Sequence, residues 1–278
     1  MIMRKIRRCL CKIFREVTVM KILAVGDVVG KTGCEFLRKK LPAIKRHYGI
    51  DIAVVNGENS AEGNGTTPFS ADHIFASGAD VITGGNHTFR RREIYDYLAS
   101  SPFCIRPANF PEGAPGSGMC IVDKGSYKAA VISIMGQVYM SPTLESPFDT
   151  ADRMIKLADE QDCKIKIVDF HAEATGEKLS LAHYLDGRVT AFFGTHTHVP
   201  TADIRVTEKG TAYISDIGMT GPENSVLGVK AELTVAMMKD KLPARFLTAD
   251  GDCFLCGAVF DVDKASGKAE KAEQIIIR

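Results

Sequence analysis

Carboxylate, carboxamide and imidazole side chains recur at the ends of short apolar runs in this 278-residue sequence. The residues that end these runs are Asp27, Glu58, Asn59, Asn86, His87, His171, His196 and His198. Oxygen and imidazole donors without a cysteine suit a borderline divalent metal such as iron, manganese or zinc. These side chains could therefore form a metal centre.

The number of donors indicates two metal ions rather than one. Leaving His87 aside, the set has three imidazoles, two carboxylates and two carboxamides, more than one tetrahedral ion binds. We expect Glu58 to bridge the ions, because each of its oxygens can bind a different one. Two neighbouring metals suit displacement at phosphorus, since they stabilise both the attacking and the leaving oxygen.

The elements that must position these residues alternate between strand and helix. Apolar, β-branched runs predict strands over 21–27, 51–59, 80–87, 128–136, 164–173, 189–198 and 211–218. Helical patterns lie between several of them, over 33–49, 69–79, 90–101 and 148–162. This alternation predicts an α/β fold. The carboxyl ends of its strands should meet at one crevice and bring the polar side chains together.

The C-terminal part departs from this alternation. Residues 252–263 and 273–278 predict an antiparallel hairpin, which we expect at the edge of the sheet. The Pro- and Gly-rich segment 106–118 predicts an ordered surface loop. The sequence contains no repeat or linker-like stretch, so we expect residues 20–278 to form a single domain.

Residues 1–19 are basic and apolar, but the apolar run is too broken for a signal peptide or a spanning helix. We expect this extension to lie outside the core, either disordered or preceding a true translation start at Met20. A helix that adheres to a membrane surface is the alternative.

The charge balance argues against one class of partner. Lys+Arg 35 against Asp+Glu 34 leaves a net charge of +1, so no global field attracts DNA or a membrane. Eight cysteines are too sparse for a disulfide-stapled secreted scaffold, which indicates a cytoplasmic protein. We expect Cys253 and Cys256 to be small buried residues of a strand rather than a zinc or redox site.

A near match to a phosphate-binding loop lies at Gly26, Gly30, Lys31 and Thr32. The loop is one residue short of G-x-x-x-x-G-K-[ST], which changes the backbone N–H groups that point inward. An NTP-driven switch is therefore a weak alternative, and we expect Asp27 to be the important residue of this segment.

Six motifs make the sequence resemble a known enzyme family: GDVVG, NGEN, GGNHTF, FHAEAT, GTHTHV and TAYISDIGMTGP. They are similar to motifs of the bacterial metallophosphoesterases of the YmdB type, a branch of the calcineurin-like superfamily. The resemblance implies a sandwich of two mixed β-sheets flanked by helices. It implies that Asp27, Glu58, Asn59 and His198 hold one metal, that Glu58, Asn86, His171 and His196 hold the other, and that His87 is the catalytic acid.

The same resemblance implies a phosphodiesterase that cleaves a cyclic nucleotide, such as a 2′,3′-cyclic nucleoside monophosphate, by attack of a metal-bridging hydroxide. It implies two divalent or trivalent ions, with iron ahead of manganese or zinc, a homo-oligomer, and only an indirect link to RNA. Val29 replaces a histidine of the wider superfamily, and NGEN replaces its G-D-x-x-D. These departures leave the identity of the metal more open than the existence of the site.

Two further functions use the same residues. A phosphomonoesterase would need the same metals, because only the pocket around the leaving group distinguishes the two reactions. A metal-dependent regulator without turnover would have no use for the proton donor His87. The run Arg90 to Arg92 could add phosphate-binding charge, although such a run is more often a solvated helix face.

Overall fold

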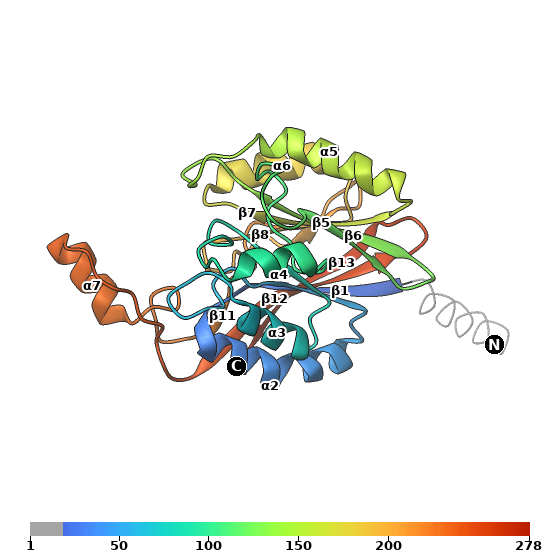
Figure 1. The fold of residues 1–278 in the computed structure, drawn as a ribbon. Helices are drawn as coiled ribbons and strands as arrows, with labels where there is room; N and C mark the ends of the chain where they lie inside the picture. Colours follow the sequence, from blue (N-terminus) through green and yellow to red (C-terminus); the bar gives the residue numbers. More distant parts are fainter. Residues whose placement is uncertain (1–18) are drawn as a thin grey trace, which may run out of the picture.

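Two mixed β-sheets pack face to face between two layers of helices in the computed structural model, which describes residues 19–278 (Figure 1). The predicted sandwich is therefore confirmed. The extension expected over 1–19 lies outside the described residues except for Val19, which begins the first strand.

The first sheet has the strand order β2-β11-β12-β1-β3-β4, with β13 on the other side of β12. Its strands are β1 (Val19–Val25), β2 (Asp27–Val28), β3 (Ile52–Asn56), β4 (Val81–Thr83), β11 (Met219–Pro222), β12 (Cys253–Asp263) and β13 (Ala269–Ile277). β3 runs parallel to β1 and β4, whereas β12 is antiparallel to β1.

The second sheet has the order β5-β6-β7-β8-β10-β9. Its strands are β5 (Met119–Asp123), β6 (Lys128–Met135), β7 (Ile165–His171), β8 (Ala191–Thr195), β9 (Arg205–Val206) and β10 (Ala212–Ile214). The four central strands are parallel, and each edge strand is antiparallel to its neighbour. Parallel strands point their carboxyl ends in one direction, which is the condition for a shared site.

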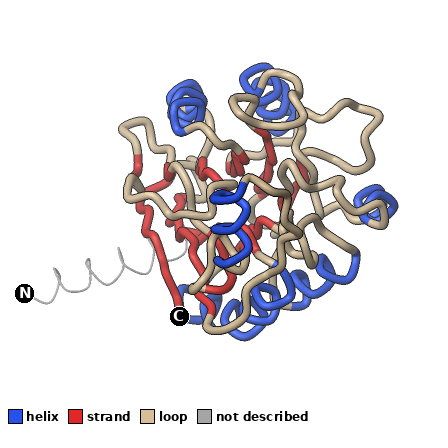
Figure 2. Tube along the Cα trace, turned by 90° about the vertical axis from the view of Figure 1, so that its left-hand side faces the viewer, coloured by secondary structure: helices blue, strands red, loops and turns tan. Residues whose placement is uncertain are grey.

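Helices cover the outer faces of both sheets, and the views in Figures 1 and 2 agree on these layers. The first sheet is covered by α2 (Gly30–Tyr48), α3 (Pro68–Ala76) and α4 (Ile94–Ser100), and the second by α5 (Pro147–Glu160) and α6 (Thr175–Leu185). A further helix, α7 (Ala231–Asp240), stands away from the sheets (Figure 1). Neither α6 nor α7 was expected from the sequence.

Local signals explain where these helices begin and end. Thr67 and Ser70 form a capping box at the start of α3, and Pro68 takes the first helical position, where its missing N–H costs nothing. Gly49 ends α2 in the left-handed conformation, with φ at 69°, which glycine adopts without strain.

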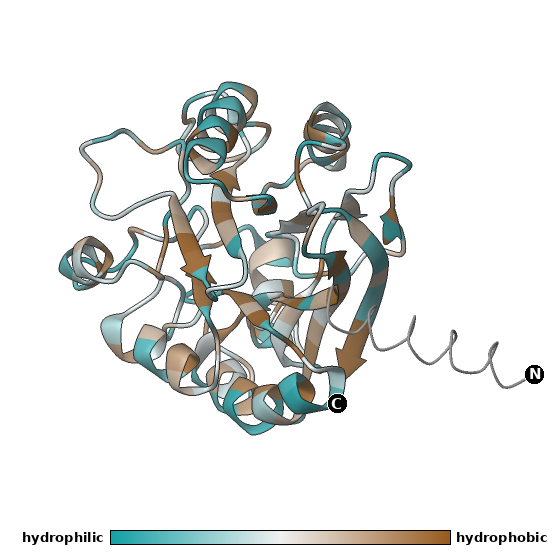
Figure 3. Cartoon of the chain, turned by 90° about the vertical axis from the view of Figure 1, so that its right-hand side faces the viewer, coloured by the Kyte–Doolittle hydropathy of each residue, from teal (hydrophilic) through white to brown (hydrophobic). Residues whose placement is uncertain are grey.

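Strand alternation creates the core. Ile22, Val54 and Phe193 belong to the apolar layer between the two sheets, while their chain neighbours face the helices. Figure 3 shows apolar residues concentrated on the strands and hydrophilic residues on the outer helices. Within residues 19–278, no helix is both long enough and apolar enough to cross a membrane.

Two expectations need correction. The C-terminal hairpin is not confined to the edge: β12 lies between β1 and β13, and only β13 is outermost. The hydrophobic run of β12 is buried on both faces, which suits an interior strand. The segment 106–118 is not wholly a surface loop, because Arg106, Ala108 and Asn109 are buried.

Candidate metal centre

The polar residues predicted from the strand ends meet at one end of the sandwich, and both sheets contribute to them. Asp27 follows β1, Glu58 and Asn59 follow β3, and Asn86 and His87 follow β4. His171 is the last residue of β7, and His196 and His198 follow β8. The structure therefore brings together all eight predicted site residues, although it takes two sheets rather than one to do so.

Glu58 lies at the centre of this group and is almost fully buried. Its Oε1 is 2.9 Å from Asn59 Nδ2, 3.0 Å from His87 Nδ1 and 3.3 Å from His171 Nε2. Its Oε2 accepts the backbone N–H of His87 at 2.8 Å. Glu58 therefore has contacts to both halves of the group, and Asp27 also reaches both, since its Oδ1 is 3.9 Å from His171 Nδ1 and 3.8 Å from His198 Nε2.

One half of the group surrounds His171 Nε2. This nitrogen is 2.9 Å from Asn86 Oδ1 and 3.1 Å from His196 Nδ1. Donor atoms of Glu58, His171 and His196 lie within 4.8 Å of one another. This half contains the four residues that the resemblance assigns to one metal.

The other half surrounds Asp27, which is completely buried. His198 Nε2 is 3.8 Å from Asp27 Oδ1 and 3.3 Å from Asn59 Nδ2. The carbonyl oxygen of Leu227 lies 3.0 Å from His198 Nδ1 and can only accept, so Nδ1 carries the proton and Nε2 keeps a lone pair. Nε2 is thus available as a ligand.

Burial and neighbouring charge shift the acid–base equilibria here in opposite directions. Burial raises the pKa of Asp27 above its usual value, although His198 and His171 oppose it. Burial also acts to raise the pKa of Glu58, but the charge and hydrogen bonds of His171 and His87 outweigh it, so this pKa lies well below its usual value. The neighbouring histidines therefore outweigh the effect of burial at Glu58 but not at Asp27.

The residues fit a bound cation by the chemistry of these donors. Asp27 Oδ1 is buried and has no hydrogen-bond partner among the described residues. Burying such an oxygen without a partner costs free energy, and a cation would remove that cost. Carboxylate, amide and imidazole donors without a thiolate suit divalent first-row metals. The site therefore accommodates metal ions through this chain's own side chains.

Gly85 makes the close packing at the centre feasible. A Cβ atom at this position would lie 2.3 Å from Glu58 Oε2 and 2.4 Å from His171 Nε2, closer than real Cβ contacts. Glycine is therefore required at position 85 because it leaves space for the Glu58 and His171 side chains. Gly194 of the GTHTH motif is required for a different reason, because a Cβ atom there would lie 1.8 Å from the carbonyl oxygen of Ser215.

The turn that carries His196 and His198 has strained backbone geometry. Their φ values are 103° and 65°, in the left-handed region that residues other than glycine rarely adopt. Asp216 Oδ2 accepts the N–H of Thr197 at 3.0 Å, between the two histidines. This buried carboxylate, which the sequence analysis did not assign, therefore helps to hold the turn.

The remaining candidates lie outside the group. Lys31 is 80% exposed and pairs with Glu35 on the surface of α2, so the near phosphate loop forms no cradle. Arg91 donates hydrogen bonds to the carbonyl oxygens of Glu62 and Asn64. The middle arginine of the run 90–92 is therefore bound to a loop of this chain. His47, His73 and His183 lie on α2, α3 and α6, outside this group.

The cysteine pair is part of the sheet. Cys253 and Cys256 are buried free cysteines of β12, and they lie three positions apart in the strand, so their side chains point to opposite faces. Burial raises the pKa of Cys256 to about 12, which keeps it a neutral thiol. The expectation that both cysteines are small buried residues of a strand is confirmed.

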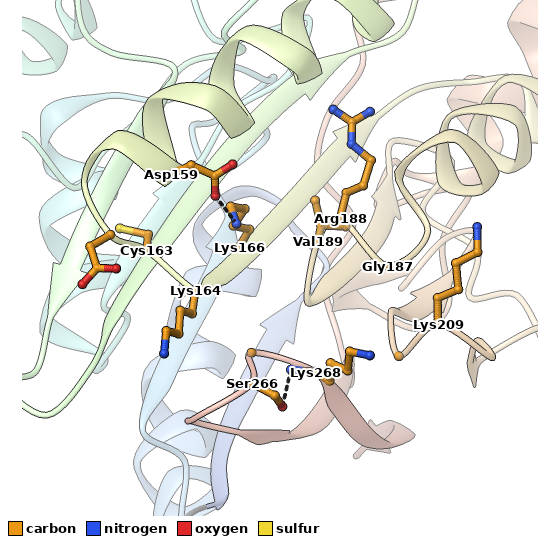
Figure 4. A pocket seen from close by; sticks show the side chains of 13 residues that line it. Asp159, Cys163, Lys164, Lys166, Gly187, Arg188, Val189, Lys209, Ser266 and Lys268 are labelled. Atoms are coloured by element: carbon orange, nitrogen blue, oxygen red, sulfur yellow. Dashed lines mark hydrogen bonds and ion pairs between the residues drawn. The ribbon is translucent and has the colours of Figure 1, made fainter.

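A separate cavity of about 230 Å³ lies at the opposite end of the second sheet, before β7, β8 and β10 (Figure 4). Lysine and arginine side chains line much of it, including Lys164, Lys209 and Lys268. None of the eight predicted site residues lines this cavity. The metal-site candidates and this basic cavity are therefore distinct features.

Comparison with known proteins identifies the family of this chain. The family model described as YmdB-like protein matches residues 23–275. A 2′,3′-cyclic-nucleotide 2′-phosphodiesterase of Bacillus subtilis is 46% identical over 258 residues, covering 93% of this chain and 97% of the relative.

Two solved structures are similar over nearly the whole chain. A hypothetical protein from Thermus thermophilus has a TM-score of 0.86 at 35% identity, covering 92% of this chain and 98% of its own. A novel phosphatase from Mycoplasma pneumoniae has a TM-score of 0.87 at 34% identity, covering 93% of both chains.

Proposed function

Because the chain belongs to the family of YmdB-like proteins, we propose that it is a metal-dependent phosphoric diester hydrolase that acts on cyclic nucleotides. The observation that carries this proposal is the position of Glu58 between two sets of oxygen and imidazole donors. The Bacillus subtilis relative supports a 2′,3′-cyclic nucleoside monophosphate as the substrate.

We propose that Glu58 bridges two metal ions. Asp27, Asn59 and His198 would complete one ligand set, and Asn86, His171 and His196 the other; the two halves described above support this division. Bound metals would supply Lewis-acid stabilisation of phosphate oxygens and activation of water. Iron is our first choice, with manganese and zinc as alternatives that the same donor types accept.

His87 is proposed as the proton donor to the leaving oxygen. Its Nδ1 lies 3.0 Å from Glu58 Oε1 and 3.1 Å from Asn59 Oδ1, two acceptors that require a proton on Nδ1. Nε2 therefore remains to hold and release a second proton. The side chain is 31% exposed, so a substrate can reach it. A donor matters because a ribose alkoxide is a poor leaving group.

Hydrolysis of a 2′,3′-cyclic nucleotide and of the matching nucleoside monophosphate, each assayed with added iron, manganese or zinc, tests this function. Faster hydrolysis of the cyclic diester is expected. Faster hydrolysis of the monoester would support the phosphomonoesterase instead. Tight metal binding with no turnover of either substrate would support the regulator without catalysis.

We also propose the homo-oligomer that the family resemblance implies. The observation in its favour is that α7 stands away from the sheets with Val235 and Met238 mostly exposed, followed by exposed Leu242. Burying such side chains against another copy would be favourable. Light scattering after size exclusion should give a mass above one chain, and Val235→Glu with Met238→Glu should lower it. A monomeric wild-type protein would overturn this expectation.

A further inference from the structure

Asp169 is a buried carboxylate that the proposed chemistry does not use. It lies on β7 two residues before His171, and alternate residues of a strand share a face. The same face of β7 carries Ile165 and Ile167, which belong to the apolar layer between the sheets. Along this face of β7 the side chains therefore change from apolar to polar where the apolar layer between the sheets meets the candidate metal centre.

Three neutral donors surround this carboxylate. Oδ1 accepts the hydroxyl of Thr195 at 2.7 Å, and Oδ2 accepts Asn56 Nδ2 at 3.0 Å and the hydroxyl of Thr83. The orientation of the Asn56 amide is set because its Oδ1 accepts the N–H of Glu58. All four residues are at most 1% exposed. Both oxygens of Asp169 are therefore engaged in hydrogen bonds within the protein.

Thr195 connects this carboxylate to a predicted metal ligand. Thr195 is the register partner of His171 in the neighbouring strand, and its Oγ1 is 2.9 Å from His171 Nδ1. A hydroxyl has one proton to donate, and a carboxylate can only accept. The proton of Thr195 is therefore directed to Asp169, so the hydroxyl oxygen accepts from His171 Nδ1–H.

We infer that Asp169 and Thr195 are positioning residues for His171, which keep the proton on Nδ1 and the lone pair of Nε2 directed into the metal centre. Nε2 is the nitrogen that faces Asn86 Oδ1 and His196 Nδ1. Hydrogen bonds of this kind orient metal-binding histidines and set their tautomer. The inference rests on the proposed role of His171 as a ligand.

Zinc binding to chelator-stripped protein tests the inference without relying on turnover. Thr195→Val removes the hydroxyl and should weaken zinc affinity about 10–100-fold, whereas Thr195→Ser should retain it. Asp169→Asn should weaken zinc affinity similarly. The new amide can donate a hydrogen bond to the Thr195 hydroxyl oxygen, and the hydroxyl proton of Thr195 can then point to His171 Nδ1. The matched control is Thr83→Val, which removes another hydroxyl bond to Asp169 but leaves the connection to His171; its affinity should stay within about two-fold.

A second measurement reports the tautomer itself. In zinc-loaded protein labelled with ¹⁵N-histidine, His171 should show a protected proton on Nδ1, assigned by its absence in His171→Gln. This signal should persist in Thr195→Ser and Thr83→Val and be lost or broadened in Asp169→Asn. Unchanged zinc affinity and an unchanged signal in Asp169→Asn would overturn the inference. Wild-type protein that binds no zinc, iron or manganese would instead contradict the proposed function.

Discussion

Lys178 Nζ lies 2.8 Å from Asp216 Oδ2, and the two side chains are only 2% and 1% exposed. Lys178 also donates to the carbonyl oxygen of Thr195, and Asp216 accepts the N–H groups of Thr197 and Gly218. Helix α6 is thereby joined to the start and the middle of the turn that carries His196 and His198. This ion pair holds a strained turn in place.

Replacing Lys178 by methionine should destabilise the protein by about 3–5 kcal/mol, because it leaves Asp216 buried without a counter-charge. The amount of bound metal should fall too, since the histidine turn loses its support. Urea unfolding and metal content per chain are the measurements. Lys156→Met, at an exposed position of α5, should change neither quantity. Equal stability of both variants would show that the ion pair does not hold the turn.

Glu58→Gln should lower the occupancy of both metals, because one lost charge weakens the attraction for two cations. Asp27→Asn and Asn86→Ala should each affect mainly one. Metal content per chain after purification distinguishes these outcomes. Glu62→Gln, at an exposed position of the following loop, is the control. Full retention of two ions in Glu58→Gln would exclude the bridging role.

His87→Ala should reduce turnover of a cyclic nucleotide roughly 10²–10⁴-fold, the usual contribution of a positioned acid. Its effect on a nitrophenyl diester should be much smaller, because nitrophenolate departs without a proton. The variant also removes a contact to Glu58, so metal content must be measured in parallel. Equal losses on both substrates, or loss of metal, would assign His87 to positioning Glu58 instead.

Gly85→Ala should disrupt the metal centre although it adds a single methyl group. The new Cβ would overlap Glu58 Oε2 and His171 Nε2, and one of the two must move. We expect loss of metal and at least about 10²-fold loss of activity, since misplacement by about 1 Å has effects of that size. Gly113→Ala is the matched control, because a Cβ there meets nothing within 4 Å. Normal metal content in Gly85→Ala would contradict the packing argument.

Asp80 should make the stability of the protein depend on pH in the acid range. Burial acts to raise its pKa, but hydrogen bonds from Lys45, the Ala53 N–H and Lys124 outweigh it, so the pKa lies below 3.8. A lowered pKa in the folded state means that the stabilisation is complete above the unfolded value of about 3.9 and is lost as pH falls through the lower folded value.

Asp80→Asn should therefore be less stable than the wild type by about 1–3 kcal/mol at pH 7, and the difference should shrink below about pH 4. Urea unfolding from pH 7 to pH 2.5 measures it. Glu208→Gln, at an exposed position, should show no such trend. A difference that stays constant across this range would contradict the assignment.

The strand-end residues and most of the order of strands and helices could be predicted from the sequence, because both follow from local pattern, whereas α6 and α7 were missed. Apolar periods mark β1, β3 and β7, and Asp27, Glu58 and His171 interrupt them where buried strands end. The motifs also identified the family, which the match over residues 23–275 confirms.

Only the tertiary structure decided which residues surround the candidate metal centre. Asp169 and Thr195 read as ordinary members of apolar runs, and their connection to His171 depends on the register of β7 against β8. Lys178 meets Asp216 across 38 residues of sequence, so no local pattern marks the pair. The interior position of β12 was missed for the same reason. Strand pairing joins segments that are distant in the sequence, so it stabilises the protein only when both strands are in place.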